Sequence, residues 1–187
     1  KHRRRQRQMC IRDRALPGLL KQNFSFIEIG TVTPLPQIGN SKPRVFRVPE
    51  EKSIINKLGF PNLGASKIFN NLCKIRKYHT LGLEPLIGVN IGCNKNTKNP
   101  LKDYEKCFEI FSSVADYITI NVSSPNTPGL RKLQLQNNLA PLLKTLSNKK
   151  KEYFKKNKRK IPLVLKIAPD LEDSDLKSIV KLISSYQ

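Results

Sequence analysis

The segment from Asn121 to Arg131 carries the residue types best suited to chemistry in this 187-residue chain. Its eleven residues include two asparagines, two serines, two prolines and a glycine, and they follow the strand-like run 117–120. Prolines stiffen such a loop, and short polar side chains suit it to hold a small polar molecule beside a hydroxyl group. An ordinary surface turn would also explain the prolines and the glycine. Composition alone therefore leaves both a ligand site and a surface turn open.

Ser124 lies between Asn121 and Asn126 and could act as a nucleophile or as a general base. A serine nucleophile of the hydrolase type needs a histidine base, and neither His2 nor His79 has an evident companion. The GxSxG motif is absent as well. The pattern leaves proton abstraction by a serine within a network of amides and a lysine.

Polar residues also stand at the carboxyl ends of apolar, strand-like runs: Thr31, Asn90, Asn121 and Lys166. A lysine in such a run needs an anion or another acceptor, and asparagine amides can donate and accept toward the edge of a heteroaromatic ring. A carboxylate partner for Lys166 and simple capping of strand ends by the asparagines are the alternatives. The coincidence of Lys166 with the two asparagines favours one shared polar site, a polar mouth, at the carboxyl ends of the strands.

Hydrophobic patterning predicts the elements that must position these residues. Four apolar runs read as strands, and five segments have helical spacing, the last with Asp173 or Ser174 as its N-cap. The predicted strands are 24–30, 86–91, 117–122 and 162–168, the predicted helices are 50–58, 65–78, 101–114, 137–154 and 172–185, and 31–47 is predicted to be a long loop.

Alternation of strands with helices predicts an α/β fold. The strands are continuously apolar, which is typical of a parallel sheet covered by helices. In (β/α)8 barrels and in open α/β sheets the site forms at the carboxyl ends of the strands. No GxGxxG motif opens a helix, so a Rossmann dinucleotide site is disfavoured.

The net charge of +21 raises the alternative of a basic nucleic-acid-binding protein. Residues 1–14 hold seven Lys/Arg and one Asp, and residues 149–160 hold eight Lys/Arg and one Glu, so two short segments supply 13 of the 21 charges. Aromatic platforms are not interleaved with these lysines. We therefore expect no nucleic-acid partner, and the alternative predicts salt-dependent binding through residues 149–160.

The cysteines and histidines give no pattern of metal ligands. The four cysteines, at 10, 73, 93 and 107, are widely spaced and form no CxxC pair, and the two histidines have no partners nearby. We expect no metal site, no disulfide framework and reduced intracellular thiols. No apolar run approaches the roughly 20 residues of a membrane span, and no signal peptide is evident.

Several ordered blocks make the chain resemble the dihydroorotate dehydrogenase family in its quinone-linked class 2 form. The resemblance runs from about Phe24 to the C-terminus. The blocks are 27–34 with 36–37 and 39–40, 43–47, 55–60, 88–92 with 94–95, 121–131 and 166–170. Ser124 stands where class 2 has a serine base and class 1 has a cysteine, which indicates class 2. Pro61 in place of the usual asparagine and Cys93 in place of a common lysine depart from the family pattern.

The resemblance implies a partial (β/α)8 TIM barrel, roughly its N-terminal half with the first strand missing. Residues 1–22 are then a disordered or non-native basic leader, and residues 23–187 are the partial barrel domain. We expect such a half-barrel to expose two sheet edges and to be incompetent as an enzyme by itself.

The resemblance also implies the roles of the site residues. Ser124 is the catalytic base, and FMN lies at the carboxyl mouth of the barrel, with Lys166 stabilising its reduced, anionic form. The implied cofactor-binding residues are Thr31, Asn90, Asn121 and Lys166. The implied substrate-binding residues are Asn56, Lys57, Leu58, Gly59, Phe60, Asn121 and Asn126.

The implied reaction is the oxidation of (S)-dihydroorotate to orotate in de novo pyrimidine (UMP) biosynthesis, with a membrane quinone as electron acceptor. The family further implies peripheral membrane association, through a segment not present in this sequence. The expected location is the cytoplasmic face of the bacterial inner membrane, with the mitochondrial inner membrane as the alternative. Another FMN-dependent barrel oxidoreductase is the alternative function closest to this one.

Overall fold

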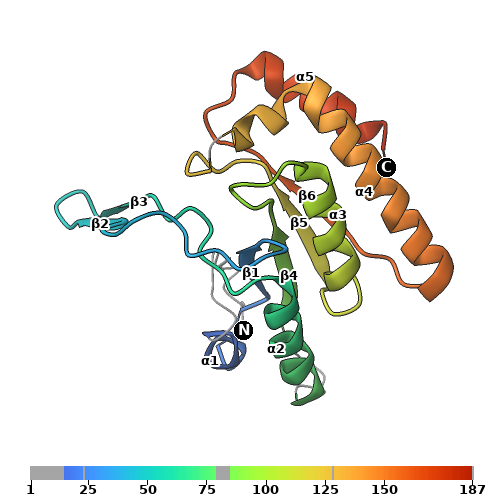
Figure 1. Cartoon of the computed structure of the whole chain (residues 1–187), viewed down its shortest axis with the longest axis horizontal. Coiled ribbons are helices and arrows are strands. Elements are labelled where there is room, and N and C mark those ends of the chain that lie inside the picture. Colours follow the sequence, from blue (N-terminus) through green and yellow to red (C-terminus); the bar gives the residue numbers. More distant parts are fainter. Residues whose placement is uncertain (1–14, 23, 79–84, 128, 187) are drawn as a thin grey trace.

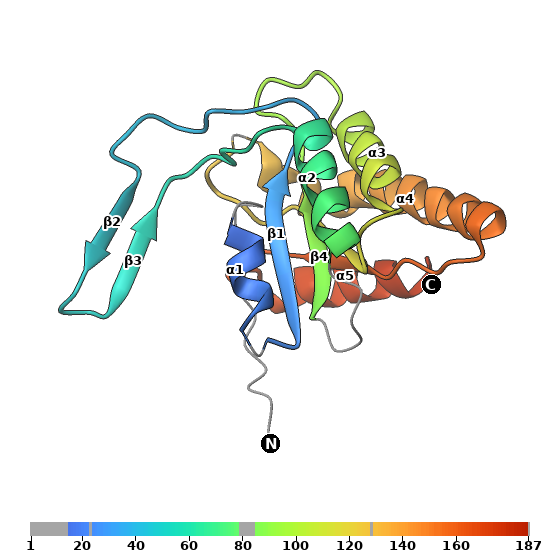
Figure 2. The ribbon, with the colours of Figure 1, turned by 90° about the horizontal axis from the view of Figure 1, so that it is seen from below.

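The computed structural model describes residues 15–22, 24–78, 85–127 and 129–186. Its centre is a four-stranded parallel sheet with the strand order β1-β4-β5-β6. A separate antiparallel hairpin, β2-β3, projects away from this sheet (Figures 1 and 2). The strands are β1 (Phe26–Val32), β2 (Val45–Val48), β3 (Ser53–Asn56), β4 (Leu86–Ile91), β5 (Tyr117–Asn121) and β6 (Leu163–Lys166).

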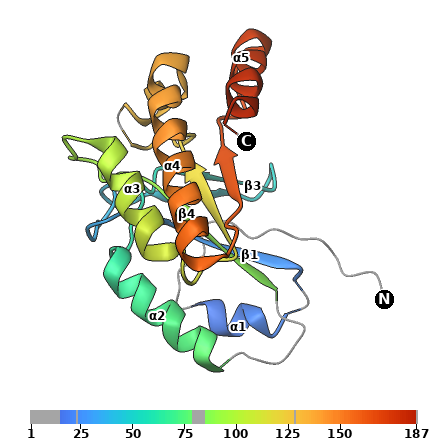
Figure 3. The same cartoon turned by 90° about the vertical axis from the view of Figure 1, so that its right-hand side faces the viewer.

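Helices connect the parallel strands in the alternating order expected from the sequence. The helices are α1 (Leu16–Leu20), α2 (Ala65–Tyr78), α3 (Pro100–Phe111), the 3₁₀ helix η2 (Leu130–Gln134), α4 (Gln136–Asn157) and α5 (Asp173–Ser184). Figure 3 shows α2, α3 and α4 in a row along one side of the sheet. This arrangement confirms the predicted α/β class and is consistent with part of a (β/α)8 barrel.

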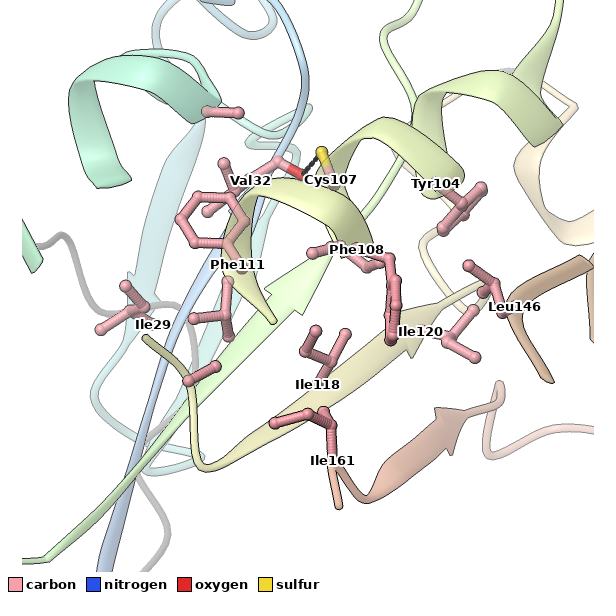
Figure 4. Close-up of a cluster of buried hydrophobic side chains, with 14 of the residues drawn as sticks. Ile29, Val32, Tyr104, Cys107, Phe108, Phe111, Ile118, Ile120, Leu146 and Ile161 are labelled. Atoms are coloured by element: carbon pink, nitrogen blue, oxygen red, sulfur yellow. Dashed lines mark hydrogen bonds between the residues drawn. The ribbon is translucent and has the colours of Figure 1, made fainter. Parts of the chain in front are cut away.

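The core lies between the sheet and α3 and α4 (Figure 4). Residues spaced three and four apart along α3, including Cys107, Phe108 and Phe111, put their side chains on one buried face. Phe108 is 1% exposed and lies against the β5 residues Ile118 and Ile120, which are equally buried. Full burial of such a side chain stabilises the fold by about 1.5–3 kcal/mol. This core fixes the strands whose carboxyl ends carry the polar residues.

The predicted helix 50–58 is wrong, because these residues form the second half of the hairpin and the chain that follows it. Ile54 and Ile55 are adjacent β-branched residues in β3, and both side chains are more than 60% exposed. Lys52 has a φ of 46°, which ends any helical path at the turn. Three apolar positions were too few to distinguish a helix from a strand. The same hairpin begins β2 at Val45, within the predicted loop 31–47.

Two predicted boundaries near helices also need correction. The N-cap of α5 is Glu172, without a side-chain hydrogen bond, whereas Asp173 lies in the first turn, where a carboxylate favours the helix dipole. The predicted leader extends too far, because α1 lies within it and Leu16 is fully buried in the core. Residues 1–14 of the leader lie outside the described residues.

Candidate active site at the carboxyl ends of the strands

The parallel register brings the four predicted polar residues to one edge of the sheet. Thr31 lies near the end of β1, Asn90 near the end of β4, and Asn121 ends β5 opposite Lys166 of β6. All three uncharged side chains are buried, with exposed fractions of 5% or less, and Lys166 is half-buried. Buried polar groups require hydrogen-bond partners, so their contacts define the site.

Hydrogen bonds join these side chains into one chain across the sheet. The Lys166 ammonium donates to Ser123 Oγ at 2.7 Å, and Ser123 Oγ donates to Asn121 Oδ1 at 2.9 Å. Asn121 Nδ2 donates to Thr31 Oγ1 at 2.8 Å, and Thr31 Oγ1 donates to Asn90 Oδ1 at 2.7 Å. Within the described ranges, Lys166 has a hydroxyl and no carboxylate as its partner. The alternative of a barrel ion pair therefore has no support among these contacts.

The chain of hydrogen bonds continues to Glu28, which sequence reasoning missed. Glu28 is fully buried in β1, where Oε1 accepts from Asn90 Nδ2 at 3.0 Å and Oε2 accepts from Thr119 Oγ1 at 2.7 Å. A charged residue within the apolar run 24–30 was the available signal. The same reasoning that singled out Lys166 in its apolar strand applies equally to Glu28.

Ser124 is half-buried and lies one residue beyond this chain of hydrogen bonds. Its Oγ accepts from Asn126 N at 3.2 Å. No hydrogen bond among the described residues links Ser124 directly to Lys166 or Asn90, and the connection runs through the neighbouring Ser123. The polar mouth and the predicted base are thus adjacent along the chain.

The loop that carries Ser124 contacts the segment that follows the β2-β3 hairpin. Asn126 Nδ2 donates to the backbone and side-chain oxygens of Asn56, both at 3.4 Å. Asn40 Nδ2 bridges the two segments by donating to Asn126 O at 3.3 Å and to Lys57 O at 3.0 Å. Of the other predicted substrate residues, Lys57 is exposed, Leu58 and Phe60 are half-buried and Gly59 is buried.

Side chains from α3 and η2 also hold the loop. Tyr104 OH donates to Asn121 O at 2.7 Å, and Arg131 Nε donates to Ser123 O at 3.3 Å. Arg131 also donates to Asp170 Oδ2 at 2.9 Å, and this hydrogen bond holds the pKa of Asp170 below its usual value. These contacts fix the backbone of Asn121 and Ser123 and thereby the positions of their side chains.

A second group of amides braces the turn that follows the hairpin. Gln37 Nε2 donates to Gly59 O at 2.9 Å, and Asn62 Nδ2 donates to Phe60 O at 2.9 Å. Asn94 Nδ2 donates to Gln37 Oε1 at 3.2 Å. Pro61 contributes no amide side chain here, and its neighbour Asn62 supplies one. The segment 56–60 is therefore held by partly buried polar contacts of its own.

Two buried cysteines lie near the site, and burial suppresses their ionisation. Cys93 is 5% exposed, and desolvation followed by the nearby Asp103 carboxylate raises its pKa to about 11. Burial also raises the pKa of the fully buried Cys107 far above its usual value. A thiol acts as a base only as thiolate, so neither cysteine is suited to that role at neutral pH. Among the described residues, no group of three His, Cys, Asp or Glu side chains could hold a metal ion.

We expect Cys93 to resist alkylation in the native protein. A pKa of about 11 leaves the thiol protonated near neutral pH, so its labelling by iodoacetamide should rise about tenfold per pH unit until that pKa. Mass spectrometry after timed labelling measures this, with the half-buried Cys73 as internal comparison. Labelling of Cys93 at neutral pH as fast as in the urea-unfolded chain would contradict the expectation.

The chain has a parallel sheet with helical crossovers and a polar cluster at the carboxyl ends of its strands. This is the arrangement of part of a (β/α)8 barrel enzyme, whose active site lies at that end. The sequence model of the family described as "Dihydroorotate dehydrogenase" matches residues 12–186. The chain belongs to the dihydroorotate dehydrogenase family.

Curated relatives agree with this assignment. The protein named "Dihydroorotate dehydrogenase (quinone)" of Aliivibrio salmonicida is 48% identical over 166 residues, covering 88% of this chain and 48% of the relative. The protein of the same name from Bartonella tribocorum is 47% identical over 165 residues, covering 88% of this chain and 44% of the relative. The chain thus spans about half the length of the curated relatives it matches.

Solved structures show the same fold. The ligand-free dihydroorotate dehydrogenase of Eimeria tenella matches with a TM-score of 0.80 and 35% identity, over 87% of this chain and 49% of that one. The complex of the Eimeria tenella enzyme with ferulenol also has a TM-score of 0.80 and 35% identity, over 86% and 47%.

Proposed function

We propose that this chain belongs to an enzyme that oxidises (S)-dihydroorotate to orotate, with FMN as cofactor and a quinone as electron acceptor. The observation that carries the proposal is the continuous hydrogen-bonded chain from Lys166 to Asn90, with Ser124 beside it. Relatives at 47–48% identity are named for this substrate and acceptor. The reaction belongs to the de novo synthesis of pyrimidine nucleotides.

The donors at the sheet edge fit the pyrimidine ring of a flavin. Asn90 Nδ2 and Asn121 Nδ2 each donate one of their two N–H groups within the network, so each has a second for a ligand. The ammonium group of Lys166 has three N–H donors, and one of them donates to Ser123. Two amide donors and an ammonium suit the carbonyl oxygens and the N1 and N5 nitrogens of oxidised isoalloxazine, which accept hydrogen bonds. When bound, FMN supplies the acceptor for the two electrons that leave the substrate.

Lys166 and the asparagines have distinct tasks in this proposal. The ammonium group stabilises negative charge that develops at the cofactor, because it is held in place before the reaction begins. Asn121 Oδ1 already accepts from Ser123 N at 3.1 Å and from Ser123 Oγ at 2.9 Å. Asn121 therefore meets a ligand only as a donor.

Ser124, Asn126 and the segment 56–60 form the proposed substrate side of the site. Ser124 Oγ takes a proton from a ring carbon of dihydroorotate as its own hydroxyl proton passes to solvent, and the Asn126 N–H that donates to this oxygen fixes its position. Asn126 lies within hydrogen-bond distance of Asn56, so substrate held between them would lie beside Ser124. Substrate and base are thereby brought together by the contact of the loop with the hairpin.

A quinone acceptor implies contact with a membrane, because quinones of this kind dissolve in the bilayer. In the described part of the chain, no helix has the length and apolar character to cross a membrane. From the quinone acceptor we propose peripheral association with the cytoplasmic face of the bacterial inner membrane. The bacterial sources of the two named relatives support a bacterial location.

A chimera tests the proposed function. In it, the matched residues of this chain replace the corresponding part of the Aliivibrio salmonicida relative. We expect the purified chimera to carry FMN and to reduce a soluble quinone analogue when dihydroorotate is added, measured by orotate absorbance. A folded chimera with FMN that forms no orotate would point to another FMN-dependent oxidoreductase. A folded chimera that binds no FMN would overturn the proposal that FMN is the cofactor.

A further inference from the structure

The carboxylate of Glu28 determines the direction of hydrogen bonding at the β1 end of the site. A carboxylate only accepts hydrogen bonds, so the Asn90 side chain must turn its nitrogen toward Glu28 Oε1. Asn90 Oδ1 then faces Thr31, whose hydroxyl donates to it. Glu28 is fully buried, and water cannot replace it as the acceptor.

The two asparagines of the site are oriented by different anchors. Asn121 is fixed at the far end of the network by the backbone N–H of Ser123, which donates to its Oδ1. This backbone donor cannot reverse, so the orientation of Asn121 does not depend on Glu28. Among the described residues, the Asn90 side chain has no hydrogen bond to the backbone, and its orientation rests on Glu28 and Thr31.

We propose that Glu28 is a positioning residue that holds the Asn90 amide with its nitrogen on Glu28 and its oxygen on Thr31, so that the second N–H of Asn90 is presented to the ligand. This inference rests on the proposed function only in naming FMN as the ligand. A reversed Asn90 would exchange a donor for an acceptor at the sheet edge. It would also place two oxygens, those of Asn90 and Glu28, against each other.

Three substitutions separate the acceptor role of Glu28 from its charge and from its part in stability. Glu28→Gln retains an oxygen for Asn90 and can turn its amide nitrogen toward Thr119 Oγ1, which is able to accept. Glu28→Met has similar length and no comparable acceptor. Thr119→Val removes the hydrogen bond from Thr119 to Glu28 and leaves the contact with Asn90 intact, so it is the matched control for lost stability.

The first measurement is hydrogen exchange of the asparagine side-chain amides by NMR, on the full 187-residue chain labelled with ¹⁵N-asparagine. We expect the amide protons of Asn90 and Asn121 to be protected in the parent chain, in Glu28→Gln and in Thr119→Val. In Glu28→Met, we expect the protection of Asn90 to fall about tenfold or more while that of Asn121 persists. Unchanged protection of Asn90 in Glu28→Met would overturn the proposal, and so would an equal loss in Thr119→Val.

The second measurement is the dissociation constant for FMN in the chimera, from flavin fluorescence, with the melting temperature of each variant recorded alongside. We expect FMN binding to weaken about tenfold or more in Glu28→Met and to stay within about threefold in the other two variants. Equal weakening in Glu28→Gln and Glu28→Met would overturn the acceptor role in favour of charge. If the parent chimera binds no FMN, the proposed function fails, while the exchange pattern of Asn90 still decides the role of Glu28.

Discussion

The variant Ser124→Ala is expected to reduce its flavin with dihydroorotate about 10²- to 10⁴-fold more slowly than the parent chimera, while FMN stays bound. Ser124 Oγ lies beside the network of Asn121 and Lys166 without belonging to it. Its removal therefore deletes the proton acceptor and leaves the contacts proposed for FMN in place. Stopped-flow absorbance of the oxidised flavin under anaerobic conditions measures the rate, and the flavin content measures binding.

Two further variants control this result. Ser184→Ala removes a serine on α5 that donates to the backbone oxygen of Val180, far along the chain from the loop, and should leave the rate unchanged. Ser124→Cys supplies a thiol in the same position and should retain part of the activity, because a thiol can also accept a proton as thiolate. An unchanged rate of flavin reduction in Ser124→Ala would remove Ser124 from the role of base.

The variant Lys166→Met is expected to slow flavin reduction by about 10²- to 10³-fold, since it removes a positive charge held where negative charge develops. The ammonium is fixed by its 2.7 Å hydrogen bond to Ser123 Oγ, so no reorganisation is needed when the reaction occurs. Methionine preserves much of the length and the apolar stem of lysine. The rate and the midpoint potential of the bound flavin are the measurements, and we expect the potential to become more negative.

Lys181→Met, on the exposed surface of α5, is the matched control for the loss of one positive charge. It should change neither the rate nor the potential. Since Lys166 also anchors Ser123, Ser123→Ala separates the two tasks, because it removes the anchor and keeps the charge. A potential that is the same in Lys166→Met and in the parent would contradict the electrostatic role.

The sequence determined the elements that depend on many regularly spaced residues. Helix α2 spans Ala65–Tyr78, the range that its amphipathic pattern predicted, and strand β4 spans Leu86–Ile91, as its apolar run predicted. Long patterns succeed because each residue adds independent support for one period. The prediction for the hairpin was wrong because the segment has only nine residues. Ile54, Ile55 and Leu58 also fit a helical period over that short length.

The sequence also indicated which residue types belong to the site. Thr31, Asn90, Asn121 and Lys166 stood out because polar side chains at the ends of apolar strands need partners. Their meeting at one edge followed from the parallel sheet, in which all carboxyl ends lie together. Their roles toward FMN and substrate stay predictions until the variants above are measured.

Only the tertiary structure decided which polar residues of the site contact each other. Glu28 and Asn90 are 62 positions apart, Glu28 and Thr119 are 91 apart, and no local pattern links them. Lys166 was expected to meet an acceptor or an anion, and the register of β5 and β6 gave it the hydroxyl of Ser123. Local spacing sets which face of a strand is buried, whereas the partner of a buried polar group is fixed by strand order and register, which depend on the packing of the whole sheet.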